Sequence, residues 1–389
     1  MHMPMMSRVR VPTASFVTWV GMGDVSGGVM GELRHRIRSS EAYGMGRKQA
    51  QRKIRVYKQV YHVRYALQWN GAYEPDVFLV FSKGKAMPVQ YRPRVLMIVH
   101  DPWIVPDKTR LHQHMGWHDP YALAQQYIAD IHTASHGLVA YQIVRALDAP
   151  WFPAKIDGFR YTSETFLRQW ATQAMHQPDA LDYRKRIEQF DLLTKLARDE
   201  YDEVWVFSFP YAGEYESVMI GPTAFWCNAP PFICPDAVRN TVMMGFNYER
   251  DVGCMLENFG HRVESIMAHT YEKNAHLHNL WEEFIRYDLT SPGAAACGNV
   301  HYAPNSTRDY EWGRSGAVLS TCDRFLDYPA SANAPARRVT AAEWGGGDMR
   351  AHHIWWLKHL PHRAERSAGE WGNWWRTVLL LDEDPLFAE

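Results

Sequence analysis

The sequence predicts an α/β protein with a mostly parallel sheet core, flanking helices, a small N-terminal β region and a loop-rich C-terminal segment. Two observations predict this class. Four largely apolar runs, at 94–99, 137–144, 202–209 and 240–247, have the length of strands, and such runs are typical of strands buried on both faces. Segments with apolar residues at helical spacing separate the runs, which indicates βαβ units.

The elements follow in a simple order along the chain. Residues 53–86 mix apolar with polar residues and are predicted to form a few antiparallel strands. Helical spacing of apolar residues predicts helices over 121–133, 183–200, 251–272 and 278–287. We therefore expect three parts: an N-terminal arm with the small β region (1–90), the α/β core (91–290), and a Trp- and His-rich C-terminal segment that closes a cleft (291–389).

The composition excludes several classes of protein. A net charge of −1 provides no basic footprint for nucleic acid and no bulk attraction to an anionic membrane. No apolar stretch approaches the roughly 20 residues of a membrane span. We therefore expect a soluble protein, cytoplasmic by default, or secreted after removal of a signal. Neither a dinucleotide-binding nor a phosphate-binding glycine motif occurs, so no nucleotide cofactor is expected. The oligomeric state is left open.

The most specific motif lies within the predicted helix 251–272. Glu257, His261 and Glu264 stand at i, i+4 and i+7, so they project from one face of a helix. Carboxylate oxygens and an imidazole on one stripe can bind a divalent metal such as zinc or manganese. Glu257 and His261 are the predicted metal ligands. The alternatives are a hydrogen-bonded pair on a helix surface and a metal-free acid/base cluster.

Part of this helix resembles the HExxH helix of zinc peptidases, which often contains the letters His-Glu-Phe-Gly-His. The same frame here is Glu257-Asn-Phe-Gly-His261. The resemblance implies that Glu257 replaces the first histidine ligand. It also places Asn258 where those enzymes have their general base, and an amide cannot accept a proton from water. The resemblance covers about five residues and assigns no family.

Further candidates surround this motif in the sequence. Glu214 and Glu216 follow a buried strand beside two tyrosines, and either carboxylate could act as acid or base. Together with Glu264 they are the predicted catalytic residues. The loop after Cys297 contains His301, which could complete the metal site. The predicted substrate-binding residues are Asp101, Tyr211, Trp226, His301, Asp309 and Trp312.

These residues predict a hydrolase of a polar polymer, peptide or glycan, in which Glu214 or Glu216 activates a metal-bound water. Two alternatives remain open: a metal-free glycoside hydrolase that uses paired carboxylates, and a non-catalytic carbohydrate-binding protein that uses Trp and Tyr faces. A third idea, with Cys297 as nucleophile and His136 as base, resembles the pairing of His-Gly and Cys-Gly in caspase-type peptidases.

Overall fold

A computed structural model describes most of the chain from residue 91 onward. The described residues are 61–65, 68–69, 72–73, 77–81, 91–105, 108–276, 278–363 and 373–381. The chain divides into two compact units, Met1–Met87 and Pro88–Glu389. In the first unit, β1 (Tyr61–Tyr65) pairs antiparallel with β4 (Val77–Phe81), and β2 (Gln68–Trp69) with β3 (Ala72–Tyr73). Most of the predicted N-terminal arm lies outside the described residues.

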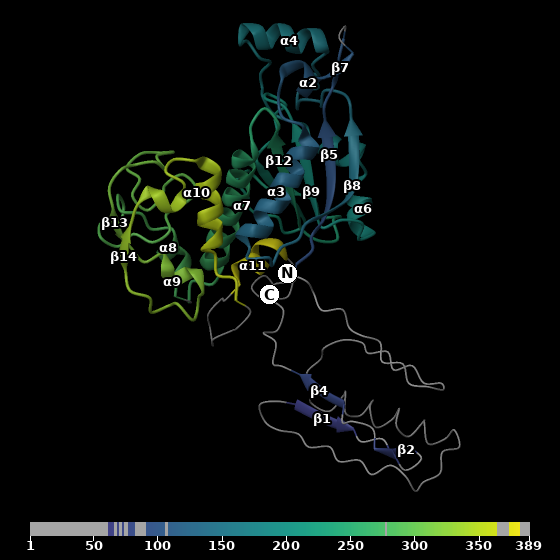
Figure 1. Ribbon diagram of the computed structural model, residues 1–389. Coiled ribbons are helices and arrows are strands. Elements are labelled where there is room, and N and C mark those ends of the chain that lie inside the picture. The colour runs from purple at the N-terminus through teal and green to yellow at the C-terminus, as the bar shows by residue number, and fades with distance from the viewer. Residues whose placement is uncertain are drawn as a thin grey trace. The chain divides into compact units, whose positions relative to one another are not determined.

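The second unit contains a six-stranded sheet in the order β11-β10-β12-β9-β5-β8 (Figure 1). Its strands are β5 (Arg94–His100), β8 (Gln142–Ala149), β9 (Glu203–Ser208), β10 (Ser217–Gly221), β11 (Phe232–Ile233) and β12 (Thr241–Asn247). The strands β8, β5, β9 and β12 are parallel, whereas β10 runs antiparallel to β12. The predicted α/β class with a mostly parallel sheet is therefore confirmed.

Helices cover both faces of the sheet because its central strands are apolar on both sides. Val95, Met97 and Val99 of β5 face α3 (Pro120–Ala134) and α7 (Val252–Lys273), while Leu96 and Ile98 face the other side. That side is covered by α5 (Tyr183–Gln189) and α6 (Leu192–Ala197). Successive side chains of a strand point to opposite faces, so an unbroken apolar run builds two cores.

Two predicted elements differ from the structure. The apolar run at 137–144 only partly coincides with β8, which begins at Gln142. β8 is the edge strand of the sheet, and most of its side chains are not buried, so an apolar run does not mark it. The single helix predicted over 183–200 is two helices, because Asp191 between them has a left-handed backbone (φ 50°).

The remaining described elements are short. They are β6 (Trp103–Ile104), β7 (Thr109–Arg110), α2 (Leu111–Met115), α4 (Ser163–Thr172), α8 (Leu280–Phe284), β13 (Val318–Ser320), α9 (Asp323–Leu326), β14 (Arg337–Val339), η1 (Ala341–Trp344), α10 (Met349–Lys358) and α11 (Trp374–Leu379). None of the helices in the described part of the chain combines the length and apolar character that a membrane span requires.

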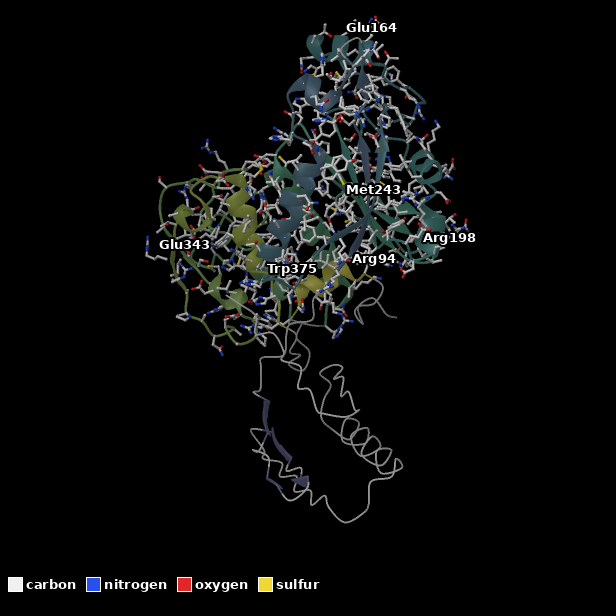
Figure 2. All side chains as sticks on the ribbon, turned by 45° about the vertical axis from the view of Figure 1, so that its right-hand side comes forward. Arg94, Glu164, Arg198, Met243, Glu343 and Trp375 are labelled. Atoms are coloured by element: carbon white, nitrogen blue, oxygen red, sulfur yellow. The ribbon has the colours of Figure 1, made fainter. Side chains whose placement is uncertain are left out.

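Buried tryptophans join the C-terminal elements to the α/β core. Trp356 of α10 and both Trp374 and Trp375 of α11 are fully buried, and α10 and α11 both pack on α7. Figure 2 shows the side chains that fill the space around these ribbons, with Trp375 labelled. Arg262 of α7 forms a buried ion pair with Glu203 of β9 and donates a hydrogen bond to the Val378 carbonyl oxygen of α11 at 3.0 Å. These contacts hold α7 firmly, and α7 carries the candidate site.

Candidate metal centre

The helix α7 carries the predicted stripe, and Glu257, the first residue of that stripe, lines a cavity. Asp251 caps its N-terminus by accepting a hydrogen bond from the Gly253 amide at 2.8 Å. Leu256, Phe259 and Val263 are fully buried in the core, which fixes the rotation of the helix. Glu257, His261 and Glu264 therefore project from the flank of α7, beside its buried face.

A loop before the first C-terminal strand brings His301 to this stripe. Asn299 shapes the loop, because its side-chain oxygen accepts hydrogen bonds from the backbone amides of His301 (3.0 Å) and Tyr302 (2.9 Å). Val300 lies directly against Gly260 of α7: a Cβ on that glycine would stand only 2.6 Å from Val300 Cγ2. The absence of a side chain at 260 thus permits the close approach that places His301 over His261.

The two imidazoles face each other through their Nε2 atoms, which are 3.1 Å apart. The Oε1 atom of Glu257 lies 3.3 Å from Nε2 of His301, and Oε2 of Glu216 lies 3.9 Å from Nε2 of His261. Ligand atoms of Glu257, His261 and His301 are all within 4.8 Å of one another. Three side chains of the types that bind zinc therefore converge on one point.

The other nitrogen of each imidazole faces a second carboxylate. His261 Nδ1 is 2.9 Å from Oε2 of Glu264, and His301 Nδ1 is 3.0 Å from Oδ1 of Asp309. Glu264 is held in turn, because its other oxygen accepts the Val300 amide at 3.0 Å. A carboxylate on Nδ1 can hold a proton on that atom, so that Nε2 can turn its lone pair to a metal when one binds.

The charges of the cluster favour a cation. Burial lowers the pKa of His261, but Glu264 and the neighbouring carboxylates outweigh burial and raise it overall. A hydrogen bond with Glu257 is the main cause of the raised pKa of His301. Burial raises the pKa of Glu257, but the imidazoles around it lower it overall. The carboxylates thus favour positive charge at this point, which a metal ion could supply.

The pKa of Glu216 shifts in the opposite direction from that of Glu257. Burial is the main reason why its pKa is raised, and the charge of Glu257 adds to that shift. Its Oε2 atom accepts a 2.5 Å hydrogen bond from the amide of Asn228, whose own backbone amide donates to Ser265 of α7 at 2.9 Å. A carboxyl group with a raised pKa beside a metal site is suited to proton transfer.

A cavity of about 600 Å³ opens next to this centre. Glu216, Glu257, Tyr310, Trp312 and Met349 are among the residues that line it. The volume is in the range of small-molecule sites in proteins. The candidate metal centre is therefore accessible to a substrate from one side.

The predicted catalytic residues fall in three different places. Glu216 faces the centre, and Glu264 stands behind His261. Glu214 lines the same cavity, but both its oxygens are bound by the guanidinium of Arg186, at 2.5 and 2.7 Å.

The predicted substrate-binding residues also separate. Tyr211 and Trp312 line the cavity, whereas Asp309 and His301 belong to the centre. Asp101 is buried elsewhere, 2.6 Å from the imidazole of His112. Trp226 is 58% exposed and does not line the described cavity.

Three residues that the sequence analysis did not select belong to the site: Asn228, Tyr310 and Met349. Tyr310 directly follows Asp309, a predicted substrate-binding residue, and this adjacency could have pointed to it. Asn228 lies in a Pro-rich loop and Met349 begins a helix far along the chain, and neither has a local pattern that points to the centre.

Cys297 has no features of a nucleophile. It is fully buried, and burial raises the pKa of its thiol well above the usual range. The thiol therefore stays protonated, whereas a nucleophilic cysteine is a thiolate. His136 stacks on His362 instead.

A second group with suitable atoms consists of Cys322, Asp323 and His359. Arg337 donates hydrogen bonds to both oxygens of Asp323, at 2.6 and 2.8 Å. A fixed cation at that distance opposes the binding of a metal ion. We therefore interpret this group as a structural polar network.

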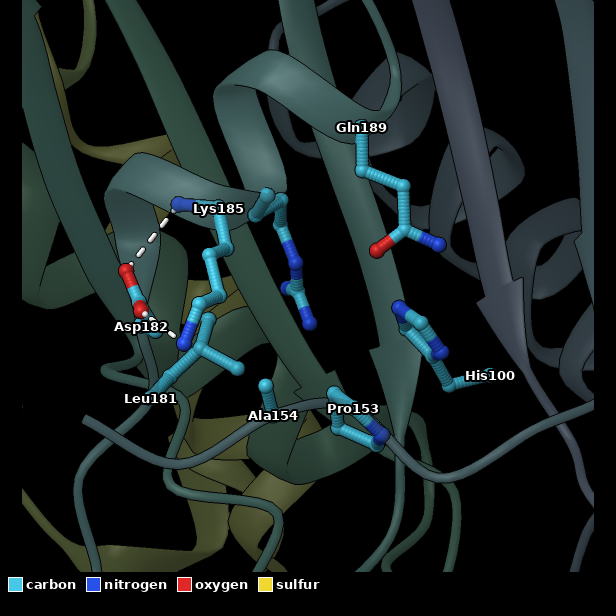
Figure 3. Close-up of a pocket in the computed structure, with 8 residues that line it drawn as sticks. His100, Pro153, Ala154, Leu181, Asp182, Lys185 and Gln189 are labelled. Carbon is cyan, nitrogen blue, oxygen red and sulfur yellow. Dashed lines mark hydrogen bonds and ion pairs between the residues drawn. The ribbon is translucent and has the colours of Figure 1, made fainter. Parts of the chain in front are cut away.

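A smaller cavity lies at the C-terminal end of β5, beside α5 (Figure 3). His100, Lys185, Arg186 and Gln189 line it, and Nδ1 of His100 is 3.1 Å from the Trp151 carbonyl oxygen. Its volume of about 10 Å³ is comparable to a single water molecule. It cannot hold a substrate, so the cavity at α7 is the better candidate.

Comparisons of this chain with protein-family models, with curated proteins and with solved structures found no match.

Proposed function

We propose that this protein is a metal-dependent hydrolase whose ion, zinc in the first instance, is bound by Glu257, His261 and His301. One observation carries the proposal. Two imidazoles from separate segments turn their Nε2 atoms to one point, and each has a carboxylate on Nδ1. Metal-binding histidines in proteins are almost always oriented in this way.

The number of protein ligands, three, also suits a hydrolytic site. Catalytic zinc sites keep a coordination position for water or substrate, whereas structural sites are closed by four protein ligands. A metal-bound water loses its proton near neutral pH. The cavity beside Glu257 is large enough for a substrate to reach that water.

Glu216 is the general base in this proposal. It lies 3.9 Å from the metal-facing nitrogen of His261, and its raised pKa makes it a good proton acceptor. With a metal bound, the ion would supply an activated water. Glu216 would hold the proton that this water gives up and pass it to the leaving group as the bond to that group breaks. Glu216 thereby performs the role that Asn258 cannot.

Elemental analysis of the purified full chain tests the proposal. We expect about one zinc or manganese ion per folded chain, because the site has the usual three ligands. The ion should be lost in Glu257→Ala/His261→Ala and kept in Glu216→Gln, which changes the base and no ligand. His118→Ala, which changes an exposed histidine between α2 and α3, is the matched control. Circular dichroism verifies that each variant folds.

The proposal fails if the wild-type protein holds no metal after incubation with zinc and with manganese. It also fails if the ion stays in the Glu257→Ala/His261→Ala variant, since the metal would then be bound elsewhere. Loss of the ion in Glu216→Gln would make Glu216 a ligand and would remove its assignment as the base.

A further inference from the structure

We propose that Tyr310 is a catalytic residue of this centre, whose phenol hydroxyl donates a hydrogen bond to the substrate oxygen on which negative charge develops. The inference rests on the proposed function. Its basis is position: Tyr310 lines the cavity on the side of His301, and the two ring centroids are 4.3 Å apart.

The phenol is close to the reacting groups. Burial is the main cause of the raised pKa of Tyr310, and the nearby carboxylates of Glu257 and Glu216 add to that rise. Both of those carboxylates accept hydrogen bonds and cannot stabilise a second negative charge. A neutral O–H group beside them supplies the missing donor.

The backbone holds Tyr310 in an unusual conformation. Its φ of 58° lies in the left-handed region, which residues other than glycine rarely adopt. Residues in this conformation are concentrated at functional sites. Its amide donates to the His301 carbonyl oxygen at 3.1 Å. The next residue, Glu311, is anchored to Thr307 through two hydrogen bonds of 2.9 and 2.8 Å.

A second aromatic contact braces the ring. The Tyr310 and Trp312 rings meet edge to face at 5.5 Å, and the Trp312 indole donates to the Val300 carbonyl oxygen at 3.2 Å. The loop that carries Tyr310 is thus attached to the same segment that positions His301. A donor held in place before the reaction stabilises a developing charge without the cost of reorganisation.

Two other tyrosines line the cavity, but neither ring contacts a histidine of the centre in the described structure. Tyr215 stacks on Tyr183 at 5.8 Å, and Tyr211 contacts Trp170 edge to face at 6.3 Å. Tyr215 is therefore a matched control: it lines the same cavity and has a ring contact with neither histidine of the centre in the described structure.

The test compares Tyr310→Phe with Tyr215→Phe in the full, zinc-loaded chain. The probe is acetohydroxamic acid, a small zinc chelator whose oxygens carry the negative charge that the phenol would recognise. Calorimetry measures its dissociation constant, and competition with a chelating dye measures zinc affinity. We expect hydroxamate to bind Tyr310→Phe about tenfold more weakly, the usual effect of one hydrogen bond to a charged group. Zinc affinity, and all properties of Tyr215→Phe, should stay unchanged.

Equal hydroxamate binding by the wild type and Tyr310→Phe would overturn the inference and leave the metal centre intact. A fall of zinc affinity by about 10–100-fold would also overturn it, because Tyr310 would then only position Glu257. Failure of the wild-type protein to bind zinc overturns the proposed function first, and this inference with it.

Discussion

Glu214 and Glu216 are two residues apart and have opposite surroundings. Arg186 binds both oxygens of Glu214, so that carboxylate is occupied by an ion pair. Glu216 meets an amide and the edge of an imidazole, and burial raises its pKa. Their positions in the sequence offered no reason to prefer one of the two as the general base. The preference comes from Arg186, which is 28 residues before Glu214.

Asp309 provides a test of the outer carboxylates. Replacing it with alanine removes the group that holds the Nδ1 proton of His301. We expect metal affinity to fall about 10–100-fold, the usual effect of losing such a partner, with little change in stability because Asp309 is half exposed. Competition with a chelating dye measures the affinity. Asp236→Ala, another exposed carboxylate, serves as the control, and an unchanged affinity in Asp309→Ala would remove Asp309 from the centre.

The helix α7 shows what a local pattern can predict. Residues at i, i+4 and i+7 share a face in any α-helix, so the stripe of Glu257, His261 and Glu264 followed from spacing alone. Which of the three would be ligands did not follow. Glu264 was a candidate catalytic residue, and it stands behind His261 because the loop amide of Val300 holds it there.

Close packing between α7 and the loop of His301 provides a second test. In Gly260→Ala the new methyl group would collide with Val300 and push His301 away from His261. We expect metal affinity to fall and the free energy of unfolding to drop by about 1–3 kcal/mol, as is typical of overpacking. Dye competition and urea unfolding measure the two effects.

The double variant Gly260→Ala/Val300→Ala makes room for the added methyl group. It should recover most of the metal affinity, because the two positions are in direct contact and their effects are not additive. If the double variant binds metal no better than Gly260→Ala, the collision is not the cause.

The whole α/β unit depends on contacts between distant segments. Arg94, at the start of β5, donates hydrogen bonds to Asp202, just before β9, with its backbone amide (2.7 Å) and its guanidinium (3.1 and 2.7 Å). Burial raises the pKa of Asp202, but these bonds outweigh burial and lower it overall. A lowered pKa in the folded state means that the ionised carboxylate stabilises the fold.

This contact predicts how stability depends on pH. The stabilisation is fully present above the ordinary aspartate pKa of about 3.9 and is lost as the pH falls through the lower, folded value. Asp202→Asn should therefore reduce the free energy of unfolding by about 1 kcal/mol at pH 7, a small effect because solvent screens this partly exposed pair. The difference from the wild type should vanish in acid.

Urea unfolding between pH 3 and pH 8 measures this dependence. Glu188→Gln, which removes an exposed carboxylate, is the control and should change stability little at any pH. A constant difference between Asp202→Asn and the wild type over the whole range would show that the charge of Asp202 has no part in it.

The sequence by itself determined the α/β class, most of the buried strands and the stripe on α7, because apolar runs and helical spacing are local properties of a chain. Only the tertiary structure decided that His301, 40 residues beyond His261, completes the cluster. The same holds for the different surroundings of Glu216 and Glu214 and for the position of Tyr310 at the cavity. Each of these depends on side chains that approach across the packed surface of α7, and such contacts arise from the way elements pack rather than from spacing along the chain.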